Sequence, residues 1–226
     1  MSPKQNTRDL TLDEQNYQLV EYGDYFVNQK NKKVSSRNLG KKFAAINAHF
    51  FEYLKGYNIP CAYVKKSDSN RLLFVRFTKF SFKVKILNAA DKRIAKLFSV
   101  KQGSLLELPV FEYHFGDSKE SLITESHLIS FDLCTYEEMK FISRLCSKIN
   151  AIIKSFFERR NETLIELTCG FGKFESKIFL IDDLSPLSLK IISNETNGNL
   201  PDPYKIETPA QMKKYTDHLL QITNGA

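Results

Sequence analysis

The spacing of hydrophobic residues along the chain predicts a mixture of amphipathic helices and strands. Three segments repeat hydrophobic residues every three or four positions, as one buried helix face requires: residues 36–57, 135–156 and 208–222. Ser36 is expected to cap the first helix, and capping boxes begin the other two at Thr135 and Thr208. Asp91 is expected to cap a shorter helix.

Between the first two long helices, the hydrophobic residues change strand face within a few positions. Phe77 belongs to one phase of the alternation and Phe82 to the opposite phase. Because successive side chains point to opposite faces, this change needs a bulge, a bend or a domain crossing. We therefore expect two domains: residues 1–79 with a small sheet and one helix, and residues 80–226 as a larger domain.

Other segments predict further strands. Residues 164–167 and 178–181 are expected to pair around a turn at Gly170 and Gly172. Residues 106–131 are expected to form strands and loops. These strands, together with the helices above, indicate a fold that contains both helices and strands.

The composition indicates a folded chain, and the distribution of apolar residues bears on its location in the cell. Of 226 residues, 42% are hydrophobic and 12% are aromatic, which is enough to bury a core. No stretch approaches ~18 consecutive apolar residues, and the first residues lack the hydrophobic segment of a signal peptide. We therefore expect no membrane span and a cytoplasmic location. The four cysteines are far apart and are expected to be reduced and mostly buried.

Two adjacent carboxylates, Asp182 and Asp183, follow directly after an apolar strand. Magnesium takes one or two hard oxygen ligands from a protein and shares the rest with water and phosphate, so this pair is a candidate Mg²⁺ site. The alternative is an acidic turn that precedes Ser185 and Pro186. The pattern leaves both interpretations open.

A group of basic residues lies near the middle of a chain whose net charge is +7. Its members are Lys83, Lys85, Lys92, Arg93 and Lys96. Lys92 and Arg93 fall in the first turn of the short helix, where free backbone amides also attract anions. The group is either a phosphate site or a solvated basic face.

Common catalytic and nucleic-acid motifs are missing from the sequence. It contains no G-x-x-x-x-G-K-[ST], no G-x-G-x-x-G and no G-x-S-x-G, which excludes a P-loop NTPase and leaves nucleophilic serine catalysis without support. No aromatic and basic motif of the RNA-binding kind occurs, so nucleic acid is not an expected partner.

The order of motifs over most of the chain resembles the SAICAR synthetase (phosphoribosylaminoimidazole-succinocarboxamide synthase) family. The segment FKVKILNAADKRIAKLF at residues 82–98 is similar to the family segment that ends in V-V-R-N-x-A-A-G-S-L-x-K-R. Residues 108–113 and 122–126 continue the similarity, and Asp182-Asp-Leu-Ser-Pro186 is similar to D-E-x-S-P-D. Order and spacing, rather than one strong motif, carry the resemblance.

The resemblance implies an α+β fold with a small N-terminal antiparallel sheet domain, a larger mixed α/β domain and a cleft between them. It also implies the family's reaction in purine biosynthesis. This reaction is an amide ligation, dependent on ATP and Mg²⁺, that joins L-aspartate to carboxyaminoimidazole ribonucleotide. Nucleotide and small-molecule substrates and a homo-oligomer follow from the same resemblance.

Carried over residue by residue, the resemblance also implies a set of site residues. Asp182 and Asp183 are the expected metal ligands. The expected substrate-binding residues are Asn88, Lys92, Arg93, Glu125, Ser126, Glu166, Ser185 and Lys190.

Several polar positions depart from the motifs of the family. The motif D-x-K-x-E-F-G has an ATP-facing lysine and a metal-binding glutamate where this chain has Thr168 and Gly170, and the arginine of V-R-N is Leu87. These changes leave two hypotheses. The chain is either a ligase with a rearranged site or a catalytically impaired relative that acts as a binding or structural subunit.

Overall fold

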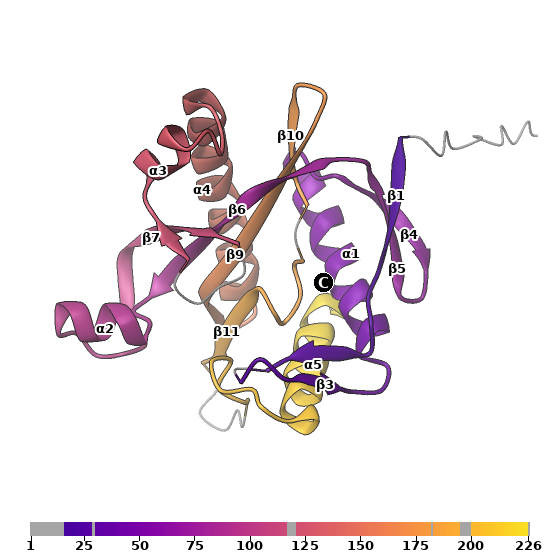
Figure 1. Ribbon diagram of the computed structural model, residues 1–226. Coiled ribbons are helices and arrows are strands. Elements are labelled where there is room, and N and C mark those ends of the chain that lie inside the picture. Colours follow the sequence, from indigo (N-terminus) through magenta and orange to yellow (C-terminus); the bar gives the residue numbers. More distant parts are fainter. Residues whose placement is uncertain (1–15, 29, 117–120, 182, 195–199, 226) are drawn as a thin grey trace, which may run out of the picture.

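The computed structural model of the chain describes residues 16–225 except residues 29, 117–120, 182 and 195–199. Helices are interspersed among the strands along the chain, as Figure 1 shows. In chain order they are β1 Tyr17–Glu21, β2 Tyr25–Val27, β3 Lys33–Ser35, α1 Leu39–Gly56, β4 Tyr63–Asp68, β5 Arg71–Val75, β6 Thr78–Ala89, α2 Lys92–Phe98, β7 Leu105–Phe115, β8 Leu122–Ile123, α3 Glu125–Ser130, α4 Tyr136–Glu158, β9 Glu162–Phe174, β10 Lys177–Leu180, β11 Leu189–Ser193 and α5 Pro209–Asn224.

The strands form one large and two small sheets with antiparallel ladders. The large sheet has the order β10-β9-β6-β7-β8, and β11 pairs with β9 on the edge that β6 leaves free. A three-stranded sheet has the order β1-β5-β4, and β2 pairs with β3. Small antiparallel sheets beside a larger sheet with helices confirm the expected α+β class.

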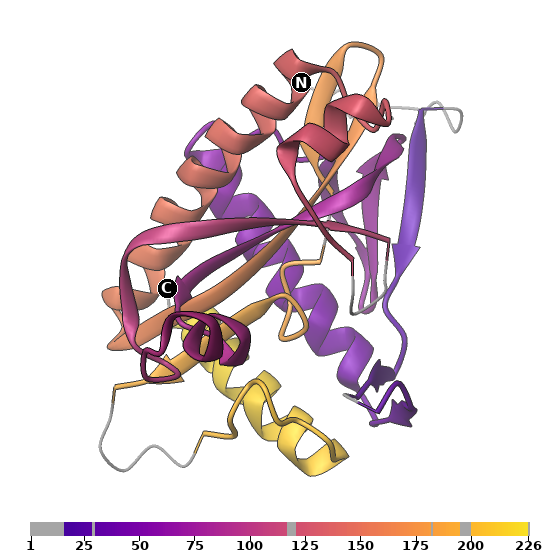
Figure 2. The ribbon, with the colours of Figure 1, turned by 60° about the vertical axis from the view of Figure 1, so that its left-hand side comes forward.

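Helix α1 joins the packing of the three-stranded sheet to that of the large sheet. The Phe51 ring stacks on Tyr63 of β4 with centroids 5.4 Å apart, while the Phe50 ring lies 5.1 Å from Phe156 of α4. Helix α4 in turn packs on β9 and β6, as Figure 2 shows from the side. Buried residues of both sheets therefore belong to one continuous hydrophobic core. The domain boundary at residue 79 stays a prediction.

Helix α1 begins later than the sequence predicts. Its N-cap is Asn38, in the left-handed conformation (φ 61°), rather than Ser36. The carboxylate of Asp24 accepts hydrogen bonds from the Asn38 and Gly40 amides at 3.0 and 2.9 Å. The expectation for Ser36 was wrong because a carboxylate from far earlier in the chain satisfies the free amides of the first turn.

The predicted change of strand face falls between β5 and β6. The register of β6 on β9 shifts between Lys79 and Lys83, so the ladder is irregular where the two phases conflict. The capping boxes at Thr135 and Thr208 and the cap at Asp91 are also confirmed. All four cysteines are free and buried. In the described part of the chain, no helix is long and apolar enough to cross a membrane.

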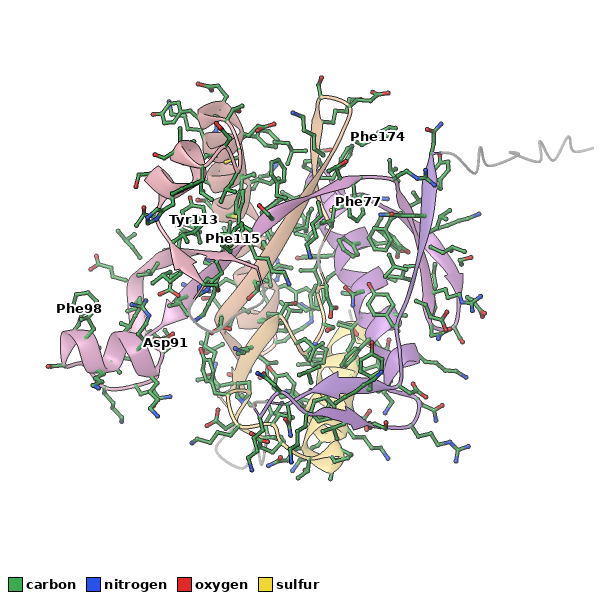
Figure 3. The ribbon with its side chains drawn as sticks, viewed as in Figure 1. Phe77, Asp91, Phe98, Tyr113, Phe115 and Phe174 are labelled. Carbon is green, nitrogen blue, oxygen red and sulfur yellow. The ribbon has the colours of Figure 1, made fainter. Side chains whose placement is uncertain are left out.

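Two local predictions were wrong. Strand β9 runs through Gly170 and Gly172, and the hairpin to β10 turns after Phe174 instead. Position 172 requires a glycine because a Cβ there would lie 2.8 Å from the ring of Phe77, which Figure 3 labels. Residues 106–131 also contain α3. The start of α3 does not match the usual sequence of a capping box, which has glutamate or glutamine at the third helical position. Here His127 takes that position, and its Nδ1 accepts the hydrogen bond from the Thr124 amide at 3.0 Å.

Candidate functional site

Four charged residues of alternating sign lie in a row across four neighbouring strands of the large sheet. Lys85 of β6 is directly opposite Glu112 of β7, and Glu166 of β9 is directly opposite Lys190 of β11. Lys85 and Glu166 are diagonal neighbours, with 3.6 Å between Lys85 Nζ and Glu166 Oε2. We call Glu112, Lys85, Glu166 and Lys190 the charge row. Because opposite charges on facing strands attract, the charge row stabilises this register of the sheet.

Helix α2 adds one charge of each sign to the charge row. Its N-cap Asp91 accepts hydrogen bonds from Lys85 Nζ at 3.0 Å and from the Ile94 amide at 2.8 Å. Arg93, in the first turn, forms an ion pair with Glu112. Figure 3 shows Asp91 at the end of α2 that meets the rest of the molecule. Three cations thus face three carboxylates, and their formal charges cancel.

The carboxylates of the charge row are far more buried than its cations. Glu112 and Glu166 expose only 4% and 3% of their surface, whereas the side chains of Lys85 and Lys190 each expose 21%. A buried carboxylate without a counter-ion is strongly destabilising. The lysines therefore have a structural role, while their partial exposure lets a ligand approach them.

Pairing favours the ionised form of these groups. Burial disfavours a charged Glu112, but the hydrogen bond with His114 and the neighbouring cations outweigh it and hold the pKa of Glu112 below its usual range. The balance at Asp91 is similar, and its pKa is also lowered. Burial opposes the charge of Lys85 as well, but Glu166, Asp91 and Glu112 raise its pKa. Asp91, Glu112 and Lys85 are therefore charged at neutral pH.

Two cavities flank Tyr204 beside the Lys190 end of the charge row. One has a volume of about 290 Å³ and is lined in part by Asn28, Leu187 and Lys190, and the other has about 310 Å³. Lys190 Nζ lies 4.5 Å from the centroid of the Tyr204 ring. Burial, the charge of Glu166 and a hydrogen bond with Glu166 raise the pKa of Tyr204, so its hydroxyl stays protonated and is engaged by that carboxylate.

The predicted metal pair is only partly placed. Asp182 lies outside the described residues. Asp183 Oδ1 accepts a hydrogen bond from Asn47 Nδ2 at 2.6 Å, and Oδ2 accepts one from Ser185 Oγ at 2.7 Å. Within the described residues, no group of three or more acidic, histidine or cysteine side chains could hold a metal ion. Magnesium needs only one or two such ligands, so both metal assignments stay predictions.

Ser185 and Asn47 together hold the loop between β10 and β11 against α1. Asn47 is fully buried, and its Oδ1 accepts a hydrogen bond from the Leu184 amide at 2.6 Å. Ser185 is also fully buried and donates to Asp183. The predicted substrate residue Ser185 thus sits inside a hydrogen-bonded loop.

Asn88 lies on the opposite face of β6 from the charge row. Its amide pairs with that of Asn150 on α4 through two reciprocal hydrogen bonds of 2.9 Å. Both groups are buried, so the pair joins the sheet to α4. A substrate role for Asn88 requires this pair to open.

The remaining predicted substrate residues are spread over two elements. Lys92 is exposed in the first turn of α2. Glu125 begins α3 and accepts a hydrogen bond from Tyr113 at 3.2 Å, and the Ser126 hydroxyl lies 2.7 Å from that of Thr124. The structure thus brings Arg93, Glu166 and Lys190 together in one cluster, with Glu125 and Ser126 on α3.

Sequence reasoning missed the centre of this cluster. It assigned Lys85 to a group of basic residues without naming an acidic partner, and it gave Glu112 no role. The available signal was a lysine on the polar phase of a strand whose neighbours are Val84 and Ile86. Only the strand order shows that Glu112 and Glu166 lie on either side of it.

Comparison with known proteins identifies the class to which this fold and cluster belong. The family model for SAICAR synthetase matches residues 11–205. The phosphoribosylaminoimidazole-succinocarboxamide synthase of Prosthecochloris aestuarii is 30% identical over 157 residues, which cover 69% of this chain and 67% of that protein. The crystal structure of the synthase from Ehrlichia chaffeensis is 24% identical with a TM-score of 0.82, and the match covers 92% of each chain.

A SAICAR synthetase structure in complex with ADP gives a TM-score of 0.85 at 20% identity, covering 93% of this chain and 92% of that one. At this identity the match shows the shared fold. The extent of the family match shows more: the chain belongs to the SAICAR synthetase family, whose members act in purine biosynthesis.

Replacing Lys85 by methionine tests the structural role of the charge row. We expect Lys85→Met to lower the free energy of unfolding by about 3–5 kcal/mol at pH 7, because buried Glu112 and Glu166 lose their shared cation. Without that cation, part of what lowers the pKa of Glu112 is gone, so the loss of stability shrinks as the pH falls toward 4.5 and Glu112 takes up a proton.

Urea unfolding at pH 7 and pH 4.5 measures both quantities. The exposed Lys148 of α4 provides a matched control, and Lys148→Met should change stability by less than about 0.5 kcal/mol. In the unmodified protein, the lowered pKa values of Glu112 and Asp91 contribute stability above pH ~4 that is lost as the pH falls further. A loss in Lys85→Met that is equal at both pH values contradicts the assignment.

Replacing Asn47 by leucine tests the attachment of the Asp183 loop. We expect Asn47→Leu to lower the free energy of unfolding by about 1–3 kcal/mol, because the buried Leu184 amide loses its acceptor and Asp183 loses a donor. Urea unfolding measures this change. Leucine in place of exposed Lys41, six residues earlier on the same helix, should have little effect. Equal effects at both positions argue against the attachment.

Proposed function

We propose that this chain binds ATP and a phosphorylated purine precursor as a SAICAR synthetase-type protein and carries out the amide ligation of the family at a reduced rate. The observation that carries the proposal is the position of Lys85. It lies directly opposite Thr168 on the neighbouring strand, so both side chains are on the same face of the sheet. Thr168 is where the family resemblance implies an ATP-facing lysine. Lys85 therefore supplies a cation on the same face from the adjacent strand.

The same cluster explains why the rate is expected to be low. Lys85, Arg93 and Lys190 are all paired with carboxylates, so a phosphate group must compete with carboxylates for each of them. An exchange of partners leaves a buried carboxylate undercompensated, which weakens ligand binding. The steps that this chain's own residues carry out are limited to binding and orientation, in which the cations hold the phosphates.

A second candidate function is a binding or structural subunit without turnover. The ion pairs of Arg93 and Lys190 favour it, as does the engagement of both carboxylate oxygens of Asp183. In this case the family framework serves to bind a ligand or a partner. The metal requirement, a cytoplasmic location and a homo-oligomer also belong to the proposal and rest on the family resemblance.

Stability measured with and without nucleotide tests the binding step. A ligand at a hundredfold excess over its Kd raises the free energy of unfolding by ~2.7 kcal/mol. We expect stabilisation by millimolar ATP, and parallel samples with Mg²⁺ and with EDTA show whether the metal contributes. Moving the lysine across the strands gives a matched control. Lys85→Thr should abolish the ATP shift, and the double variant Lys85→Thr with Thr168→Lys should restore it.

Turnover separates the two candidates. Purified protein is supplied with ATP, L-aspartate and carboxyaminoimidazole ribonucleotide, and formation of the amide is followed. Slow product formation that Thr168→Lys increases supports the ligase. Stabilisation by ATP without product supports the binding subunit. If ATP neither stabilises the protein nor leads to product, the ligase and a nucleotide-binding subunit are both excluded.

A further inference from the structure

Six exposed basic residues gather where the β2–β3 hairpin meets the N-terminal ends of α1 and α5. Two belong to the hairpin, two to the segment that leads into α1 and its first turn, and two to the beginning of α5. Among the described residues, none of the six forms an ion pair, so their charges face solvent. We call this set the basic end; its members are Lys32, Lys33, Arg37, Lys41, Lys213 and Lys214.

Contacts between these elements keep the basic end together. Asp24, just before the hairpin, caps α1, and Lys42 of α1 forms an ion pair with Asp217 of α5. Figures 1 and 2 both show the hairpin and the first turns of α1 and α5 at one end of the molecule. Both carboxylates are thus engaged, and Glu207, which precedes α5, is partly buried. The N-terminal ends of two helices add partial positive charge, so positive charge predominates here.

The basic end borders one of the two cavities at the Lys190 end of the charge row. This cavity, of about 290 Å³, is lined by Asn31 from the hairpin loop and by Met212 of α5, and it reaches Lys190. Lys32 directly follows Asn31 in the chain, and Lys213 directly follows Met212. None of the six members of the basic end lines the cavity itself. They can therefore attract an anion toward Lys190 without holding it there.

The charge row itself exerts little force on a distant ion. Lys85, Lys190 and Arg93 are each paired with a carboxylate, and the formal charges of the cluster cancel. Unpaired cations act over a longer range, about 10 Å at 0.1 M ionic strength. A phosphorylated ligand that approaches from solution is therefore attracted mainly by the basic end, and it meets the charge row only after it has entered the cavity.

We propose that the basic end steers phosphorylated substrates into the cavity at Lys190, so that it sets their rate of association while other residues hold them. The proposal rests on the proposed function, because it takes a nucleotide as the ligand of this site. The ligand class is an anion with several phosphate charges, since the attraction grows with the charge of the ligand. Clefts surrounded by charge of one sign raise association rates by roughly 10- to 1,000-fold.

Rapid mixing of the full chain with ATP and with AMP, each carrying the same fluorophore on the ribose, tests the proposal. The triple variant Lys32→Gln, Arg37→Gln and Lys214→Gln removes one cation from each element of the basic end. At about 0.01 M ionic strength, where charges act over about 30 Å, the association rate of ATP should fall at least fivefold. The dissociation rate should change less than about twofold, because charges outside a contact act mainly on association.

A matched control separates steering from the net charge of the chain. Lys140→Gln, Arg144→Gln and Lys148→Gln remove the same number and kinds of exposed cation from the N-terminal half of α4, which lies at the opposite end of the molecule in Figures 1 and 2. This variant should leave the association rate within about twofold of the unmodified protein. Urea unfolding shows whether both variants are folded.

Salt and ligand charge give two further comparisons. At 1 M salt, where charges act over only about 3 Å, the unmodified protein and the basic-end variant should bind ATP at the same rate. The basic-end variant should slow AMP less than ATP, because AMP carries about half of the negative charge.

The outcomes distinguish this proposal from the proposed function. ATP binding whose association rate is unchanged in the basic-end variant, or is lowered equally in both variants, overturns steering and leaves the proposed function intact. A change in dissociation alone shows that these residues contact the ligand, which also overturns steering. Steered, salt-sensitive association without amide formation supports this proposal and removes only the ligase. If the unmodified protein binds neither nucleotide, both proposals are overturned.

Discussion

The pairing of Lys85 with three surrounding carboxylates is the constraint on which this part of the structure depends. Glu112 and Glu166 are buried on the strands to either side, where a carboxylate without a counter-ion is strongly destabilising. A slip of β6 by one residue would turn Lys85 toward the hydrophobic face that α4 covers. Asp91, bonded to the same ammonium, fixes where α2 begins. Strand register and helix position are thus tied to one charge.

The same constraint shapes what the site can do. A phosphate-binding site needs cations that are free to meet a ligand, whereas a stable buried network needs them paired. Here Arg93 and Lys190 are paired with buried carboxylates, and this pairing limits their ability to bind phosphate. Lys85 occupies the face on which Thr168 stands, so the sheet keeps a cation there even though β9 has none at that position. Replacing a lysine on one strand by a lysine on its neighbour preserves charge and face, but it changes which carboxylates share that charge.

Sequence patterns predicted the parts of the fold that depend on neighbours along the chain. The capping boxes at Thr135 and Thr208 need only residues three positions apart, and the helical periodicity needs only a few turns. The cap on α1 comes instead from Asp24, which is distant in the sequence. A glycine is needed at position 172 because the ring of Phe77, from another part of the chain, lies against it. No local pattern contains these contacts.

The candidate site was predictable to the same limited degree. The resemblance selected Arg93, Glu166 and Lys190, which do lie together, because family motifs record positions that the fold brings near one another. Lys85 and Glu112 carry no motif, and their roles depend on the order β11-β9-β6-β7.

The charge row also reaches the surface of the molecule. Glu112 belongs to the charge row and also lines a hollow of about 580 Å³ beside α2, and its partner Arg93 lies on the wall of the same hollow with about half of its side chain exposed. A group that enters the hollow and removes water from the Arg93–Glu112 pair strengthens their attraction. An anionic ligand that draws Arg93 away from Glu112 acts in the opposite direction. Because both events compete for one guanidinium, contacts in the hollow and charge in the cluster cannot vary independently.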